Sequence, residues 1–340
     1  MFSRSTVGLS YILFIALSIS LLFEADRAFG CTSDGRYLMG TVLEITLCQQ
    51  SEATPQQLAR VTKDLFAATA RLEAMISTFS LDSSVSFLNA HAGQGAYSVP
   101  PEVAALLRLS LQYWRMTQGT FDITVGPLMQ IWGQAGQTQT IPSPTTLRQE
   151  RARLGGDKIT ILSNKYVKLM HKGMTIDLGG IGKGYALDQL VDVLKNQKIA
   201  NALLNFGQSS VWALGAPPDA PQWRLLVQRP TGQDVGVIAL HNQALSISAS
   251  FGQTFTIQGR RYGHVIDPRN GIPLQRDLLA CVVAPTATEA EALSKALLIL
   301  GEKDGIALLE QLPQIEGFLG EADGRQWMTT GWRFQKFKDT

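Results

Sequence analysis

The most informative stretch of the sequence is Asp177-Leu-Gly-Gly-Ile-Gly-Lys-Gly-Tyr-Ala-Leu-Asp188. Apolar residues before it predict a strand, and the apolar spacing after it predicts a helix. A glycine-rich turn between a strand and a helix exposes backbone N–H groups and the positive end of the helix dipole to an anion, and Lys183 adds a positive charge. The spacing fits neither the Walker A pattern nor G-x-G-x-x-G. The stretch therefore predicts either a phosphate-binding turn of another kind or a turn with a purely structural role.

Hydrophobic periodicity predicts the elements on both sides of this turn. Helices are expected after Pro55, Pro101 and Pro144, across Tyr185, and over residues 288–300 and 303–312. Strands are expected over residues 41–47, 159–162, 166–170, 174–178, 202–206, 210–214, 223–227, 235–240 and 245–248. Because the two types mix without a regular βαβ alternation, we expect an α+β fold, with mixed sheets and packed helices in one two-lobed unit.

The composition excludes several classes of protein. Of 340 residues, 45% are hydrophobic and 17% are charged, which excludes a disordered chain and a small disulfide scaffold. The 30 basic and 28 acidic residues give a net charge of +2, too balanced to suggest a nucleic-acid-binding protein.

The N-terminus has the pattern of an export signal. Arg4 precedes an apolar run over residues 7–23, and Ala28-Phe-Gly30 supplies a small-x-small cleavage site. We expect residues 1–30 to be a signal peptide or an N-terminal anchor, a buried core helix being the remaining alternative. The functional domain is then residues 31–340, in an exported protein.

The three cysteines leave two questions open. Cys31 follows the cleavage site directly, so acylation of Cys31 and a lipid tether are one alternative, although Ala28 stands where a leucine is usual. An exported compartment permits a bridge between Cys48 and Cys281, but two separate buried thiols are equally compatible with the sequence. No cysteine has a CxxC or histidine neighbour, so thiol chemistry and a zinc site are not expected.

The stretch His264-Val-Ile-Asp267-Pro-Arg-Asn-Gly271 is rich in turn residues. His264 and Asp267 are three residues apart, close enough to meet at one substrate hydroxyl as a base and an orienting carboxylate. The alternative is a loop histidine that bonds to the backbone.

The stretch Gly119-Thr-Phe-Asp122-Ile-Thr-Val-Gly-Pro127 places a hydrogen-bond acceptor beside an aromatic ring and ends in a Gly-Pro turn. Phe121 and Asp122 together suit an adenine or isoalloxazine ring. Packing of Phe121 in the core is the alternative.

In order and spacing, these segments resemble the FAD:protein FMN transferases, the ApbE family. The resemblance covers nearly the whole chain after residue 31 and also includes Met39-Gly-Thr41, Ser77-Thr-Phe-Ser80, Trp132, Asn205-Phe-Gly207 and Ala284-Pro-Thr-Ala. It implies an ApbE-like flavin transferase fold and FAD as substrate. The implied reaction moves FMN from FAD to a threonine or serine hydroxyl of an exported redox protein and releases AMP. The implied location is the periplasm or the extracytoplasmic face of the inner membrane.

The resemblance also implies roles for individual residues. His264 and Asp267 correspond to the base region, and the Gly182 carbonyl falls where the family offers a backbone ligand to magnesium. The flavin-dinucleotide pocket corresponds to Met39, Phe79, Thr120, Phe121 and Asp122. The turn that holds the phosphates corresponds to Gly179, Lys183 and Tyr185.

The sequence departs from the family at the expected magnesium site. Glu291 and Lys295 stand where the family carries aspartate and threonine ligands, and residues 247–251 are altered as well. Three interpretations of the pair are open. The two side chains form a surface salt bridge, or the Lys295 ammonium replaces part of the metal charge, or Mg²⁺ binds through Glu291 and water with Lys295 turned away.

These departures leave two rival functions beside the transferase. One is a protein that binds FAD without transferring FMN, which the altered Glu291 and Lys295 would favour. The other is an FAD pyrophosphatase, which uses water in place of a protein hydroxyl. His264 and Asp267 favour an enzyme over a binding protein.

Overall fold

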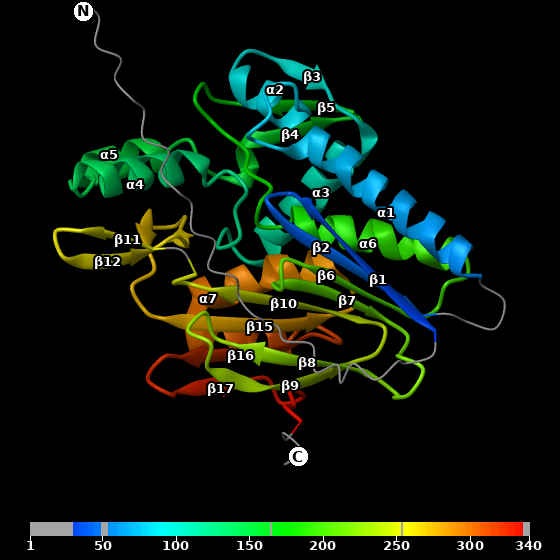
Figure 1. Ribbon diagram of the computed structural model, residues 1–340. Coiled ribbons are helices and arrows are strands. Elements are labelled where there is room, and N and C mark those ends of the chain that lie inside the picture. The colour runs from blue at the N-terminus through cyan, green and yellow to red at the C-terminus, as the bar shows by residue number, and fades with distance from the viewer. Residues whose placement is uncertain (1–29, 49–53, 164, 253, 336–340) are drawn as a thin grey trace, which may run out of the picture.

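The structure is a computed structural model that describes residues 30–48, 54–163, 165–252 and 254–335. The predicted signal peptide or anchor, up to residue 29, lies outside the described residues. Within the described part of the chain, no helix combines the length and the apolar character that crossing a membrane requires. Strands and helices mix irregularly along the chain, which confirms the predicted α+β class (Figure 1).

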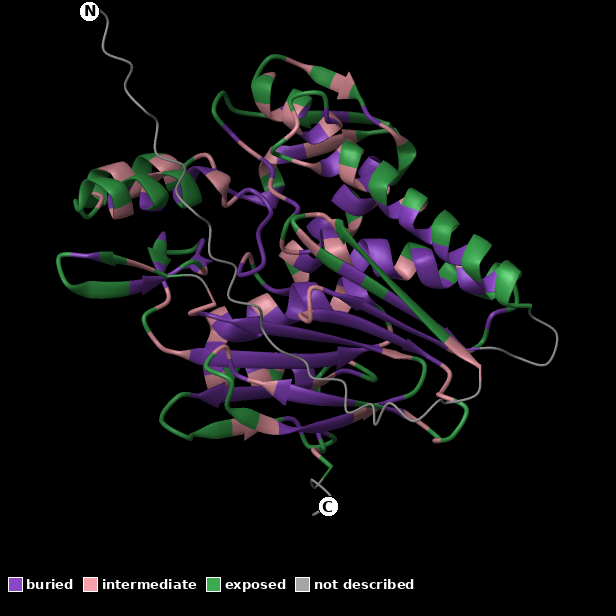
Figure 2. Ribbon diagram, in the orientation of Figure 1, coloured by how far each residue is buried: buried purple, intermediate pink, exposed green. Residues whose placement is uncertain are grey.

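One large antiparallel sheet forms the centre of the molecule. Its strands lie in the order β1-β2-β6-β7-β10-β15-β16-β17. Their bounds are β1 Cys31–Leu38, β2 Thr41–Cys48, β6 Ala202–Phe206, β7 Ser210–Leu214, β10 Gln243–Ala249, β15 Leu278–Ala284, β16 Glu316–Glu321 and β17 Gln326–Met328. Every residue of β6, β7 and β15 is buried, so both faces of the sheet are covered (Figure 2).

Each face of the sheet has its own core, because successive side chains of a strand point to opposite faces. Leu204 and Phe206 of β6 lie in the core on the helical side, whereas Leu203 lies in the core on the other side. The helical side is formed by α1 (Pro55–Ile76), α2 (Ser84–Ala90), α3 (Pro101–Met116), α6 (Gly182–Asn196) and α7 (Ala287–Glu310). The other side is covered by the hairpin of β8 (Trp223–Gln228) and β9 (Asp234–Leu240).

A third, smaller core lies beside the sheet. Leu128 and Trp132 pack there against Ile257 and Tyr262, and the Trp132 and Tyr262 rings are 5.3 Å apart. It joins α4 (Gly126–Thr138) and α5 (Pro144–Arg151) to the hairpin of β11 (Thr254–Ile257) and β12 (Arg260–Gly263). The remaining elements are β3 (Ala96–Ser98), β4 (Ile159–Leu162), β5 (Tyr166–Leu169), a 3₁₀ turn (Gly156–Lys158), β13 (Ile266–Asp267) and β14 (Ile272–Pro273).

Local sequence signals explain where most elements begin. Helix α1 starts with a capping box, in which the Thr54 hydroxyl accepts the Gln57 N–H at 3.2 Å and the Gln57 side chain accepts the Thr54 N–H at 2.8 Å. Pro55 occupies the first turn, where its missing N–H costs nothing. The helix predicted after Pro55 is therefore confirmed.

Other predictions of secondary structure are wrong. Residues 174–178 form no strand, and Gly126-Pro127, predicted as a turn, opens α4. By contrast, the two helices predicted over residues 288–300 and 303–312 are confirmed, since α7 consists of two helical halves separated by non-helical backbone at Gly301 (φ 76°, ψ −163°). Strand β15 was not predicted, because its sequence LLACVVA is a continuous apolar run without the alternation of a half-buried strand.

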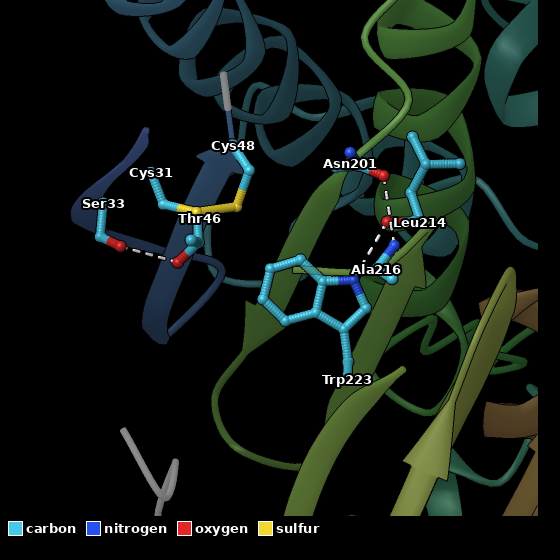
Figure 3. Close-up of a disulfide and its surroundings, with 8 residues drawn as sticks. All are labelled: Cys31, Ser33, Thr46, Cys48, Asn201, Leu214, Ala216 and Trp223. Atoms are coloured by element: carbon cyan, nitrogen blue, oxygen red, sulfur yellow. Dashed lines mark hydrogen bonds between the residues drawn. A yellow bond between two sulfur atoms is a disulfide. The ribbon is translucent and has the colours of Figure 1, made fainter. Parts of the chain in front are cut away.

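The cysteines pair in a way that the sequence did not indicate. Cys31 is bridged to Cys48, its direct neighbour in the β1–β2 register (Figure 3). Cys281 is a free buried thiol. The proposed bridge between Cys48 and Cys281 is therefore wrong, and so is the alternative of two separate thiols. Strands β6, β7 and β10 lie between β2 and β15, which at about 4.8 Å per strand keeps those two cysteines far apart.

Asp188 fixes the start of α7 against α6 and the sheet. Its carboxylate accepts the Ala287 N–H at 2.8 Å, the Thr288 N–H at 2.9 Å and the Trp212 indole N–H at 3.0 Å. Burial raises the pKa of Asp188, and these donors oppose that effect by stabilising the charged form. The side chain therefore acts as a cap for α7 that comes from another helix.

We expect Asp188→Ala to lower the free energy of unfolding by about 3 kcal/mol, because buried donors then lose their acceptor. Urea unfolding followed by fluorescence measures the change. Asp192→Ala, at an exposed position of the same helix, is the matched control and should change stability by less than about 0.5 kcal/mol. Equal effects of the two substitutions would contradict the role given to Asp188.

Candidate functional site

A cavity of about 510 Å³ lies where segments from distant parts of the sequence meet. It is bounded by the β1–β2 turn, the end of α1, the segment before α4, the glycine turn before α6, the loop after β12, and α7. The volume falls within the range of small-molecule and cofactor sites. The lining combines apolar walls with a few charged side chains, which makes this cavity the candidate functional site.

The glycine turn is held in place by side chains outside it. The amide of Asn89 donates to the Ile176 carbonyl at 2.9 Å and accepts the Ile176 N–H at 2.7 Å. Asp177, which lines the cavity, accepts the Gly179 N–H at 2.7 Å. The Asn89 amide thus makes both of the Ile176 backbone hydrogen bonds that a neighbouring strand would otherwise make, although residues 174–178 belong to no strand.

Gly184 allows the first turn of α6 to touch α7. A Cβ atom on Gly184 would lie 2.3 Å from the Ala287 carbonyl oxygen, which no side chain tolerates. Because the two helices meet so closely here, the side chains of α7 reach the glycine turn. The second half of the Asp177–Asp188 motif is therefore a helix-packing feature as well as a turn.

Two lysines and one glutamate form the charged floor of the cavity. The Lys183 ammonium lies 3.2 Å from Glu291 Oε1, and both Lys183 and Lys295 line the cavity. Glu291 is fully buried, accepts the Ser210 hydroxyl at 2.5 Å and the Gly184 N–H at 2.9 Å, and is not among the described lining residues. Glu291 is therefore an internal counter-ion for the lysines.

The pKa values of Glu291 and Lys295 follow from this arrangement. Burial alone would raise the pKa of Glu291, but Lys183 and Lys295 lower it to about 2. Burial lowers the pKa of Lys295 to about 8, although Glu291 opposes the shift. At neutral pH the Glu291 carboxylate is therefore ionised and the Lys295 ammonium carries most of its charge.

The aromatic wall is formed by the segment before α4. Phe121 is buried, and its ring lies beside Gly180 of the glycine turn. Asp122 also lines the cavity, but Thr124 and Trp114 already occupy its carboxylate, with the Thr124 N–H at 2.7 Å and the Trp114 indole N–H at 3.1 Å. Burial raises the pKa of Asp122. Asp122 therefore stabilises its own loop more directly than it offers an acceptor to a ligand.

His264 is exposed and lines the cavity at the loop after β12. Asp267 is buried and is not among the described lining residues; its carboxylate binds the Arg269 N–H at 2.9 Å and the Arg269 guanidinium at 2.9 Å. The Trp132 indole donates to the Gly271 carbonyl at 2.7 Å and ties the same loop to α4. Asp267 thus shapes the loop that presents His264.

The structure brings most of the predicted site residues to this one cavity. Those that line it are Met39, Phe79, Thr120, Phe121, Asp122, Gly179, Gly182, Lys183 and His264. Tyr185 lies in the helical-side core and, like Asp267 and Glu291, is not among the described lining residues. The sequence motifs did not single out Glu73 and Met129, which line the cavity from α1 and α4. Neither stands in a stretch with its own signal, so only the tertiary structure could identify them.

The described residues do not fit a magnesium ion at the position of Glu291 and Lys295. Mg²⁺ requires oxygen ligands in near-octahedral geometry, and both oxygens of Glu291 are committed to protein donors. An ammonium group, that of Lys295, faces the cavity instead of an oxygen. Among the described residues, no group of three or more His, Cys, Asp or Glu side chains is placed to hold a metal ion.

Comparisons with known proteins agree on one family. Residues 39–319 match the model of the ApbE family. The FAD:protein FMN transferase of Haemophilus influenzae is 28% identical, with 89% of this chain and 90% of the relative covered, and that of Escherichia coli K12 is 30% identical, with 67% of each covered.

Solved structures give the same result for the fold. The flavin transferase ApbE from Vibrio cholerae superimposes with a TM-score of 0.77 at 24% identity, covering 88% of this chain and 97% of that one. The apo form of the Pseudomonas stutzeri flavinyl transferase ApbE gives a TM-score of 0.75 at 26% identity, covering 88% of this chain and 95% of that one.

We expect Gly184→Ala to lower the free energy of unfolding by roughly 1–3 kcal/mol, since the new methyl group forces α6 and α7 apart. Gly133→Ala is the matched control within α4, because a Cβ there meets nothing within 4 Å. It should leave stability unchanged or raise it by up to about 1 kcal/mol. Thermal unfolding compares the two, and a neutral Gly184→Ala would contradict the close helix contact.

Proposed function

The chain belongs to the ApbE family, and from this premise we propose that it is an FAD:protein FMN transferase. It moves FMN from FAD to a hydroxyl group of an acceptor protein. The observation that carries this proposal is one cavity with two chemically different parts, an aromatic wall at Phe121 and a cationic floor at Lys183 and Lys295. A flavin dinucleotide has the matching parts, an aromatic ring system and an anionic pyrophosphate.

The reaction is a phosphoryl transfer. The acceptor hydroxyl oxygen attacks the phosphorus atom of the FMN half, a new phosphoester bond forms, and the anhydride bond to AMP breaks. His264, exposed at the cavity, is assigned as the base that takes the hydroxyl proton. Asp267 is assigned a positioning role, because it holds the His264 loop through Arg269. Lys183 stabilises the negative charge of the phosphates.

The substrates follow from the same reaction. FAD is the donor, and a threonine or serine of an exported redox protein is the proposed acceptor site. His264 supports a protein acceptor because it is exposed, so that a side chain of another protein can reach it. Met39, Phe79, Thr120 and the glycine turn around Gly179 are proposed to contact the dinucleotide.

We further propose that the protein is exported and acts in the periplasm or on the extracytoplasmic face of the inner membrane. The Cys31–Cys48 disulfide supports this location, because such bonds persist in oxidising compartments. Acylation of Cys31 would use the same sulfur atom that the bridge uses. We therefore assign Cys31 to the disulfide, which leaves the leader, residues 1–30, as the alternative tether.

The transferase is tested with residues 31–340, FAD and a flavin-acceptor domain, and mass spectrometry of the acceptor. We expect a covalent FMN adduct, and His264→Ala should slow its formation by roughly 10²- to 10⁴-fold. His171→Ala, at an exposed position that is not among the described lining residues, is the control and should transfer at the normal rate. Free FMN without an adduct would indicate an FAD pyrophosphatase. Bound but unchanged FAD would indicate a protein that binds FAD without transferring FMN. A fully active His264→Ala variant would contradict the assignment of His264 as the base.

Alkylation of the exported, denatured protein tests the cysteine assignment. Without reductant, iodoacetamide should modify one cysteine, Cys281, and after reduction all three. The mass should show no added acyl groups. A diacylglyceryl adduct on Cys31, with Cys48 open to alkylation before reduction, would reverse the assignment.

A further inference from the structure

The cavity floor carries more positive than negative charge. Lys183 and Lys295 contribute two ammonium groups, and Glu291 contributes one carboxylate. That carboxylate is fully buried and already bonded to Ser210 and Gly184. Within this group of three side chains, there is therefore one more positive than negative charge.

Lys295 lines the cavity, and its ammonium group has no hydrogen-bond or ion-pair partner among the described residues. Among the described residues, Glu291 forms its ion pair with Lys183, and no ion pair or hydrogen bond of the Lys295 ammonium is present. The Lys295 stem runs beside the glycine turn, with Cε 3.7 Å from where a Cβ of Gly180 would lie. The surface salt bridge expected between Glu291 and Lys295 is thus not formed, since Glu291 is buried and paired elsewhere.

The surroundings of Lys295 determine which part of a bound ligand its ammonium group can contact. Lys295 and Phe121 both lie beside Gly180 of the glycine turn, because a Cβ there would be 3.6 Å from the Phe121 ring and 3.7 Å from Lys295 Cε. A ligand whose ring system lies at the Phe121 wall would bring its phosphates to this point. Backbone N–H groups at the start of a helix and a lysine ammonium together form a typical phosphate site.

We propose that Lys295, with Lys183, binds the pyrophosphate of FAD directly, so that this chain binds FAD and transfers FMN without a divalent metal ion. The inference rests on the proposed function for the identity of the ligand. The two ammonium groups provide the positive charge that phosphoryl transfer requires at the phosphates. Glu291 keeps the two lysines close together by reducing their mutual repulsion.

The main alternative is a divalent ion held elsewhere in the cavity. Glu73, Asp122 and Asp177 also line it, and Asp177 uses one oxygen for the Gly179 N–H. An ion bound there would supply positive charge to the phosphates in place of Lys295. The two arrangements differ in their response to a chelator, because only the second loses its cation.

Binding is measured by titrating FAD into metal-free protein in EDTA, and again with excess Mg²⁺. We expect the two dissociation constants to agree within about twofold. Lys295→Met, which keeps the stem and removes the charge, should weaken FAD binding roughly tenfold to a hundredfold, the effect of one charge-assisted hydrogen bond. Lys295→Arg should restore most of the affinity, and Lys303→Met, at an exposed position of the same helix, should bind as the unmodified chain does.

Riboflavin, which has no phosphate, distinguishes charge recognition from a damaged pocket. Its affinity should be equal in the unmodified chain and in Lys295→Met. A parallel loss of riboflavin and FAD binding would assign Lys295 a structural role and overturn the proposal, and so would FAD binding that disappears in EDTA. Metal-free FAD binding that depends on Lys295, without FMN transfer even in Mg²⁺, would keep the Lys295 contact and reject both metal-free transfer and the proposed function. Transfer only with Mg²⁺ would keep the proposed function and reject the inference.

Discussion

The buried carboxylate of Glu291 is the interaction on which the site depends. It joins α7 to the first turn of α6 through the Gly184 N–H, to β7 through the Ser210 hydroxyl, and to the cavity floor through Lys183. A buried charge is tolerated only when its partners are complete, and removing one partner of such a pair typically costs about 3–5 kcal/mol. The glycine turn precedes the α6 residues that this carboxylate holds, so the position of the turn follows from the same contact. Asp188, one helical turn further along α6, repeats the arrangement by capping α7.

The sequence allowed prediction of the elements whose signals are local. Helix α1 follows a complete capping box, and β6 and β7 are apolar β-rich runs bounded by turn residues. Strand β15 lacks such a signal, because a strand covered on both faces has no polar alternation to distinguish it. The segment 174–178, predicted as a strand, is a different case. Its β-like sequence is satisfied by the side chain of Asn89, 87 residues away from Ile176, and no window of sequence contains both partners.

The same distinction applies to the site. Residues in motifs, such as Lys183, Phe121 and His264, were found and line the cavity together. Other predicted site residues are not among the described lining residues and have structural roles. Asp267 bonds to its own loop, Tyr185 packs in the core, and Glu291 is a counter-ion behind the wall. A motif therefore indicates which segments reach a site, but which side chain of a segment faces the cavity depends on packing against elements far away in the sequence. The pairing of Cys48 also depended on an undetected strand, β1, opposite β2.

The β1–β2 hairpin links the first residue of the functional domain to the cavity in a fixed geometry. Its two-residue turn, Met39-Gly40, has positive φ at both positions and lines the cavity, while Cys31 is at the far end of β1 and covalently locked to β2. A strand of this length spans about 25 Å. Residue 31 is consequently held about that far from the turn that lines the cavity, on paired strands at the edge of the large sheet rather than on a loose chain. The hairpin thus acts as a rigid spacer between residue 31 and the cavity.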